Sequence, residues 1–123
     1  MTDTNAPAIY VMVRTDLPIA DQMVQVGHVC ALAASTFTVP ERCRLVLLAV
    51  DNVDALDAAI ARCREFGVRT VSFYESDPVD PPPSPFQGEG RGEVPMGVTA
   101  LCTEPIDRAD RRPLRRYRLW RAA

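Results

Sequence analysis

Apolar residues group into four short runs that predict β-strands. The runs are residues 9–13, 43–50, 68–74 and 98–103, and each is rich in β-branched, aromatic or other apolar side chains. Nearly every residue of 43–50 is apolar, which predicts a central place in a sheet for that strand. Strands alternating with helices predict a single α/β domain with a mixed, partly parallel sheet of about four to five strands flanked by helices.

Two segments between these runs have the spacing of amphipathic helices. The first begins near Asp16 and Pro18, and we expect one apolar stripe to face the core: Ile19, Met23, Val26, Cys30 and Ala33. The second begins at the capping residues 51–52 and ends at Gly67, a residue type that often terminates helices. Its expected buried face consists of Val53, Leu56, Ile60 and Cys63.

Polar residues on the first helix are candidates for chemistry. Asp21, Gln25 and His28 follow at i, i+4 and i+7, so we expect them on one face, away from the apolar stripe. Asp77 follows the third strand, and ligands of α/β sheets bind near strand ends of this kind. An imidazole changes charge near neutral pH, which suits a general base. A solvated helix face and ordinary loop acids would explain the same residues without any chemistry.

Two segments differ in composition from the rest of the chain. Nine of the 18 residues in 78–95 are Pro or Gly, which predicts a flexible surface loop, with a substrate-ordered lid as the alternative. Residues 107–123 hold seven arginines against two acids, whereas residues 1–106 hold seven against fourteen. We therefore expect a basic carboxyl-terminal segment on an acidic body, with a short helix at best and an edge strand at 117–120.

Composition excludes several classes of protein. A chain of 123 residues with 47% hydrophobic and 24% charged residues is typical of one globular domain, here 1–123. No apolar run reaches the ~18 residues that cross a bilayer, and no export signal is visible, so we expect a cytoplasmic protein. Four cysteines without a C-x-x-C pair and one histidine indicate no metal site, and no motif indicates a cofactor. All 14 basic residues are arginine, a bias typical of a high-GC bacterial genome.

The first strand runs into R-x-D-L at residues 14–17, and the helix after it carries Q-x-x-H at residues 25–28. This combination resembles the amino-terminal motif of the type 2 peptidyl-tRNA hydrolases. Thr99 matches the threonine that opens the last core strand of that family, and Asp77 matches the Asp of its D-A-G-R-T segment. The resemblance covers nearly the whole chain apart from 78–95.

The resemblance implies a mixed sheet flanked by helices, and hydrolysis of the ester that joins a peptide to the 3′ ribose of tRNA. His28 or Asp77 would orient or deprotonate the water, and Arg14 would supply positive charge. Asp16, Gln25 and Thr99 match the family pattern, and we expect them to contact the substrate. We also expect substrate contacts from Asp21 on the same helix face as Gln25 and, in the basic segment that would meet tRNA, from Arg115 and Arg116. No cofactor, metal or membrane is implied.

The chain departs from the family pattern in two places. It contains no lysine, so the lysine at the start of the family's first helix has no counterpart, and Asp21 falls near its position. D-A-G-R-T is replaced by residues 75–78 and the loop after them. Arg14 or Arg91 could replace the missing charge, but a guanidinium does not readily exchange a proton. Two alternatives for the function are left open: a catalytically degenerate member that binds RNA or protein, and a domain that shares only the fold. A homodimer is left open as the oligomeric state.

Overall fold

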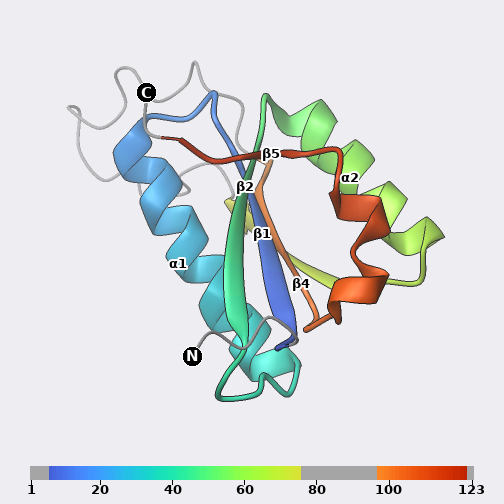
Figure 1. Cartoon of the computed structure of the whole chain (residues 1–123). Coiled ribbons are helices and arrows are strands. Elements are labelled where there is room, and N and C mark those ends of the chain that lie inside the picture. Colours follow the sequence, from blue (N-terminus) through green and yellow to red (C-terminus); the bar gives the residue numbers. More distant parts are fainter. Residues whose placement is uncertain (1–5, 76–96, 122–123) are drawn as a thin grey trace, which may run out of the picture.

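The computed structural model describes residues 6–75 and 97–121, so Asp77 and the predicted loop 78–95 lie outside the described residues. The described elements follow the expected order, with strands, helices and two short 3-10 turns (Figure 1). They are β1 (Ala8–Arg14), α1 (Ile19–Thr36), β2 (Arg44–Val50), α2 (Val53–Glu65), β3 (Thr70–Glu75), β4 (Gly97–Thr103), η1 (Arg108–Asp110), η2 (Arg112–Leu114) and β5 (Arg118–Leu119).

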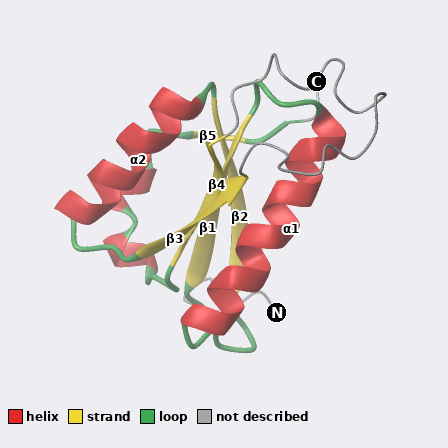
Figure 2. Ribbon diagram, turned by 180° about the vertical axis from the view of Figure 1, so that it is seen from behind, coloured by secondary structure: helices red, strands yellow, loops and turns green. Residues whose placement is uncertain are grey.

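The five strands form one mixed sheet in the order β3-β4-β1-β2-β5. β1 and β2 run parallel, whereas β4 pairs with both β1 and β3 in the antiparallel sense, and β5 is antiparallel to β2. Helix α1 covers one face of the sheet and α2 covers the other (Figures 1 and 2). The predicted α/β class with a mixed, partly parallel sheet is confirmed.

The centre of the sheet is β1, not the strand at 43–50 as the sequence predicted. Every residue of β1 is buried. Tyr10 and Met12 pack in the core under α2, whereas Val11 and Val13 pack in the core under α1. β2 lies next to β5, which pairs only with Leu48 and Ala49, and Leu45 at the other half of β2 is 52% exposed. The apolar run therefore forms a strand whose first half has no neighbouring strand on the β5 side among the described residues.

The buried face of α1 agrees with the prediction at Val26, Cys30 and Ala33, which lie in or against the core, and differs from it in the first turns of the helix. Ile19 and Met23 are 49% and 65% exposed, and the buried residues of the helix are Gln22, Gln25, Val29 and Ala33. Polar side chains can occupy this face because they are hydrogen bonded: Gln22 Nε2 donates to the Leu17 carbonyl at 2.6 Å, and Trp120 Nε1 donates to Gln22 Oε1 at 2.7 Å. Pro18 is the residue at the N-cap, so Asp16 does not cap the helix.

Helix α2 follows its sequence signals closely. Asn52 caps it by accepting a hydrogen bond from the Ala55 N–H at 2.9 Å, and Gly67 adopts a positive φ of 75° just after it ends. Leu56, Ala59 and Cys63 are buried against the sheet. The carboxyl-terminal segment forms 3-10 turns and the exposed edge strand β5, as expected. Within residues 6–75 and 97–121, no helix has the length and apolar character that a membrane crossing needs.

Candidate functional site

The residues of the amino-terminal motif lie at one end of the sheet, where β1 ends and β4 begins. Because β4 runs antiparallel to both neighbours, Val13 faces Ala100 and Glu75 at the end of β3 faces Gly97. Helix α1 passes over the same strands and contacts both β3 and β4. The end of β1, the start of β4 and the first half of α1 therefore place the motif residues near one another.

Arg14 is fully buried and forms a two-point ion pair with Asp16. Its Nε and Nη2 donate to Asp16 Oδ1 and Oδ2, both at 2.9 Å, and its Nη1 donates to the Val98 carbonyl at 3.3 Å. The side chain of Arg14 has 0% exposure and that of Asp16 has 35%. The positive charge is thus compensated inside the protein, and the geometry makes Arg14 a support for Asp16 rather than a group that meets a substrate.

Thr99 and Gln25 join β4 to α1 through a buried hydrogen bond. The Thr99 hydroxyl lies 2.9 Å from Gln25 Oε1 and 3.3 Å from the Phe73 carbonyl, its second acceptor. Thr99 is 0% exposed and Gln25 is 6% exposed. The expectation that Gln25 shares a solvent-facing surface with Asp21 and His28 is therefore wrong. A buried amide can satisfy a buried hydroxyl, and this pairing fixes the helix on the sheet.

His28 and Asp21 are exposed on α1. The His28 ring stacks on Phe73 of β3, with 4.4 Å between the ring centroids and 5° between the planes. This contact holds the imidazole against the strand whose continuation carries Asp77, two positions beyond Glu75 and outside the described residues. Among the predicted site residues that the structure describes, His28, Asp16 and Asp21 have ionisable side chains that reach solvent.

The described cysteines do not supply an activated nucleophile. All four are free thiols, and burial raises the pKa of Cys102 to about 12 and also raises the pKa of Cys63. A thiol is nucleophilic as the thiolate, so raised pKa values make these groups inert near neutral pH. In the part of the chain that the structure describes, no group of three His, Cys, Asp or Glu residues is placed to hold a metal ion.

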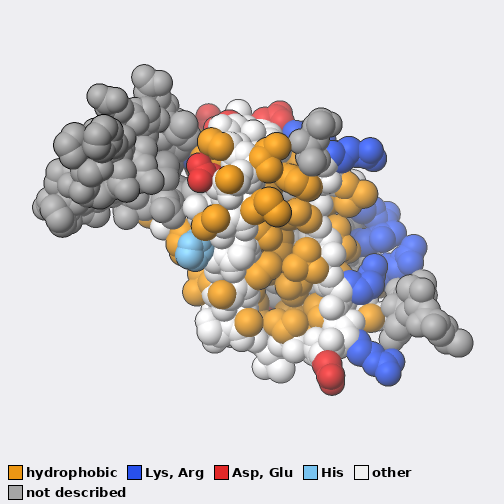
Figure 3. Space-filling model, turned by 90° about the vertical axis from the view of Figure 1, so that its left-hand side faces the viewer, with side chains coloured by type: hydrophobic (Ala, Val, Ile, Leu, Met, Phe, Trp, Pro, Cys, Tyr) orange, Lys and Arg blue, Asp and Glu red, His pale blue; other side chains and the backbone are white. Residues whose placement is uncertain are grey.

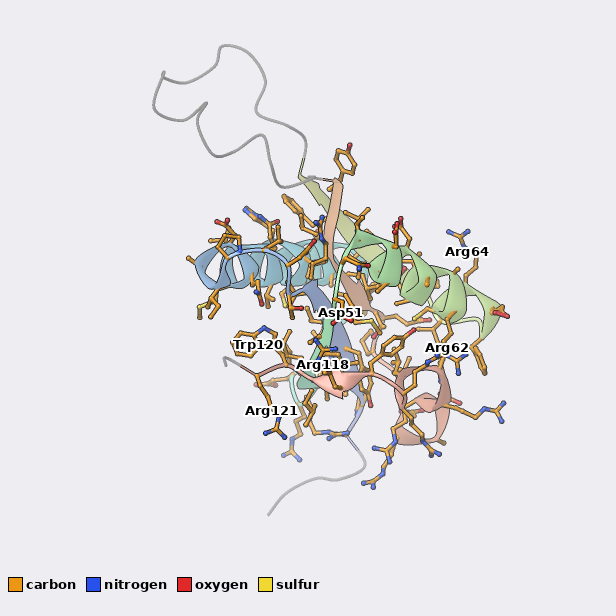
Figure 4. The ribbon with its side chains drawn as sticks, turned by 90° about the horizontal axis from the view of Figure 1, so that it is seen from above. Asp51, Arg62, Arg64, Arg118, Trp120 and Arg121 are labelled. Atoms are coloured by element: carbon orange, nitrogen blue, oxygen red, sulfur yellow. The ribbon has the colours of Figure 1, made fainter. Side chains whose placement is uncertain are left out.

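The structure does not bring Arg115 and Arg116 to the motif residues. Both follow η2, and Arg115 lines a cleft together with Tyr10 and Arg44 from the first halves of β1 and β2, whereas Arg14 ends β1. Farther along the segment, Arg118 of β5 forms an exposed ion pair with Asp51 at 2.9 Å (Figure 4). Arg115 therefore lies on a surface separate from the motif residues, whereas Arg118 lies beside the residue that follows β2.

Sequence reasoning missed an apolar surface on α1 and β2. Hydrophobic side chains gather on this face of the molecule, with arginines along one border (Figure 3). The exposed ones include Ile19, Met23, Val24 and Leu45. A groove of about 140 Å³ beside them is lined by Gln22, Met23, Val26, Leu47 and Trp120. The signal was present in the sequence, but helical spacing alone assigned Ile19 and Met23 to the core.

Comparisons with known proteins bear on the fold. No protein-family model matches the chain. No curated protein matches its sequence either. A solved structure of a protein of unknown function from Agrobacterium tumefaciens superposes with a TM-score of 0.62 at 14% sequence identity, covering 98% of this chain and 100% of that one. At this identity, the likeness shows that the two chains share a fold.

Proposed function

We propose that the protein hydrolyses the ester between a peptide, or an N-blocked amino acid, and tRNA, at the sheet end beside His28. The observation that carries the proposal is the convergence of the motif residues from separate elements. Arg14 holds Asp16 where β1 ends, Thr99 of β4 holds Gln25 of α1, and His28 follows Gln25 by about one helical turn on the same helix. A tRNA substrate also implies a cytoplasmic location.

In this proposal His28 is the general base. A water oxygen attacks the ester carbonyl carbon while the imidazole accepts the water proton, and the stack on Phe73 fixes the ring orientation. The bond between the carbonyl carbon and the 3′ oxygen then breaks, and the imidazolium returns the proton to that oxygen. Asp16, held by Arg14, and Asp77, outside the described residues, are the carboxylates that would orient the water.

The absence of lysine gives the proposal a quantitative consequence. The charge of Arg14 is already paired with Asp16, so it does not replace a free ammonium beside the developing oxyanion. Removing one oxyanion donor costs an enzyme roughly 10²–10³ in turnover. We therefore expect hydrolysis slower by about that factor than in a related enzyme that has the lysine.

Release of the N-acetylated amino acid from N-acetyl-aminoacyl-tRNA tests the proposal. We expect His28→Ala to lower turnover at least ~100-fold, the usual contribution of a general base, and Asp77→Asn to lower it as well. Asp57→Asn, at an exposed acid on α2, is the matched control and should not change it. Unchanged turnover in both site variants, or no turnover by the wild type, contradicts the proposal.

The apolar surface on α1 and β2 favours a second candidate, a binding module without turnover. Exposed residues such as Met23 and Leu45 would meet a protein partner, and the basic segment would meet RNA. Contacts between arginines and phosphates make affinity fall steeply with salt. Absence of turnover together with salt-sensitive tRNA binding would support the RNA-binding form, and absence of both would leave a protein partner.

A further inference from the structure

A second region, rich in arginine, lies where the basic segment packs on the first halves of β1 and β2. It is a cleft of about 240 Å³, walled in part by Tyr10, Val46 and Tyr117. Three arginines from separate parts of the chain also line it, Arg44 of β2 and Arg111 and Arg115 beside η2. Folding therefore brings three arginines from separate parts of the chain to the lining of one small cleft.

Among the described residues, no ion pair neutralises the positive charge of this cleft. The ion pairs between described residues join Arg14 to Asp16, Arg69 to Glu104 and Arg118 to Asp51, and none includes an arginine of the cleft. No acidic residue is among the described residues that line the cleft. Asp107 and Asp110 line a neighbouring cavity, which shares Arg115 with it. Arg116 adds charge nearby, with its guanidinium 6.0 Å from the centroid of the Tyr117 ring.

Arg111 supplies the observation that points to a ligand. Its Nε is buried and has no hydrogen-bond partner among the described residues. Arg44 is weakly engaged, because the contact of its Nε with the Ala6 carbonyl is 3.5 Å long. A buried donor without an acceptor is costly, and folded proteins rarely tolerate one. Because Arg111 lines the cleft, an anion whose oxygen meets this Nε on binding would remove that cost.

We propose that this cleft binds a phosphate group. Arginine forks match phosphate oxygens in charge and geometry, and several forks can act on one phosphate together. A volume of about 240 Å³ is below the ~300–1,000 Å³ of sites for drug-sized ligands, so it suits a phosphate group with little attached to it. Inorganic phosphate, a nucleotide and an RNA backbone all present this group. The inference does not depend on the proposed ester hydrolysis.

Calorimetric titration of the full chain with inorganic phosphate, with 5′-AMP and with tRNA tests the site. We expect Arg111→Gln and Arg115→Gln each to weaken binding about tenfold or more, because each removes a charge-assisted hydrogen bond. Arg64→Gln on α2 removes the same charge at an exposed position away from the cleft and should leave affinity unchanged (Figure 4). Arg115 is exposed, so its variant keeps the fold even where Arg111→Gln does not.

Each outcome decides the proposal. Binding of all three probes, weakened in the two cleft variants alone, supports a site for the phosphate group itself. Binding of tRNA alone, weakened in the same variants, supports the site and identifies a nucleic acid backbone as its source. Equal affinity in all four proteins, an equal loss in Arg64→Gln, or no binding of any probe by the wild type overturns it. His28→Ala leaves this cleft intact, so failure of the proposed hydrolysis is distinguishable from failure of the phosphate site.

Discussion

Arg14 and Arg111 each have a buried Nε, and the two atoms differ in whether the protein supplies an acceptor. Arg14 ends the central strand, and its Nε donates to Asp16, two residues further along the chain. Arg111 lies beside a 3-10 turn, and its buried Nε has no partner among the described residues. A guanidinium stays charged at any physiological pH, so burial must be offset by an acceptor. Where the protein supplies that acceptor, the charge holds the fold together; where it does not, the charge is available to a ligand.

The largest effect expected from this comparison is on stability at the end of β1. Asp16→Ala leaves Arg14 buried without its carboxylate and should lower the free energy of unfolding by about 2–3 kcal/mol, somewhat less than for a fully enclosed pair because Asp16 is partly exposed. Asp51→Ala, which breaks the exposed pair with Arg118, is the control and should cost about 0–1 kcal/mol. Urea unfolding measures both, and equal losses would mean that burial of Arg14 has no special cost.

A smaller effect on stability is expected from Cys102, whose buried thiol, unlike a guanidinium, is neutral when it is protonated. Burial raises the pKa of Cys102 from 9.0 to about 12. Between these pH values only the unfolded chain releases the thiol proton, so the stability present below pH 9 is lost as pH rises. We expect a contribution of up to about 1.4 kcal/mol per pH unit. Unfolding at pH 8, 9 and 10 measures it, and Cys102→Ala should have a shallower slope; the same slope in both proteins would contradict the assignment.

The smallest change in the free energy of unfolding is expected for a substitution of Arg111. Because its Nε has no partner among the described residues, Arg111→Gln removes no ion pair and should change the free energy of unfolding by less than about 1 kcal/mol. A rise in stability is consistent with relief of the unsatisfied donor. Urea unfolding in phosphate-free buffer is the measurement. A loss of 2 kcal/mol or more would make Arg111 a structural residue like Arg14 and remove the contrast between the two regions.

Local signals predicted most of the secondary structure. Helix α2 begins at Asn52 and ends before Gly67 because capping and a positive φ depend on residues adjacent in the chain. The strands lie close to the predicted runs. The first turns of α1 were misassigned because hydrophobic spacing cannot show that Gln22 and Gln25 find partners far away in the sequence, in Trp120 and Thr99.

The sequence motifs predicted that several of the candidate residues lie near one another, but they did not predict the burial of each side chain. R-x-D-L and Q-x-x-H selected residues that the fold does bring to one end of the sheet. The same motifs do not show that Arg14 is enclosed and that Gln25 is buried, whereas His28 remains exposed. Burial depends on which strand becomes central. β1 is central because β2 pairs with one of its edges and β4, far along the chain, pairs with the other.

The class of the fold and the order of the elements could be predicted from the sequence. So could the uneven distribution of charge along the chain, in which arginine supplies the positive charge throughout. These properties follow from composition and from interactions between near neighbours. Only the tertiary structure shows which of the described arginines form ion pairs with acidic residues and which line the cleft without one. Arg44 and Arg111 line the same cleft although they are far apart in the sequence, and the electrostatic energy of a charge depends on what surrounds it in space.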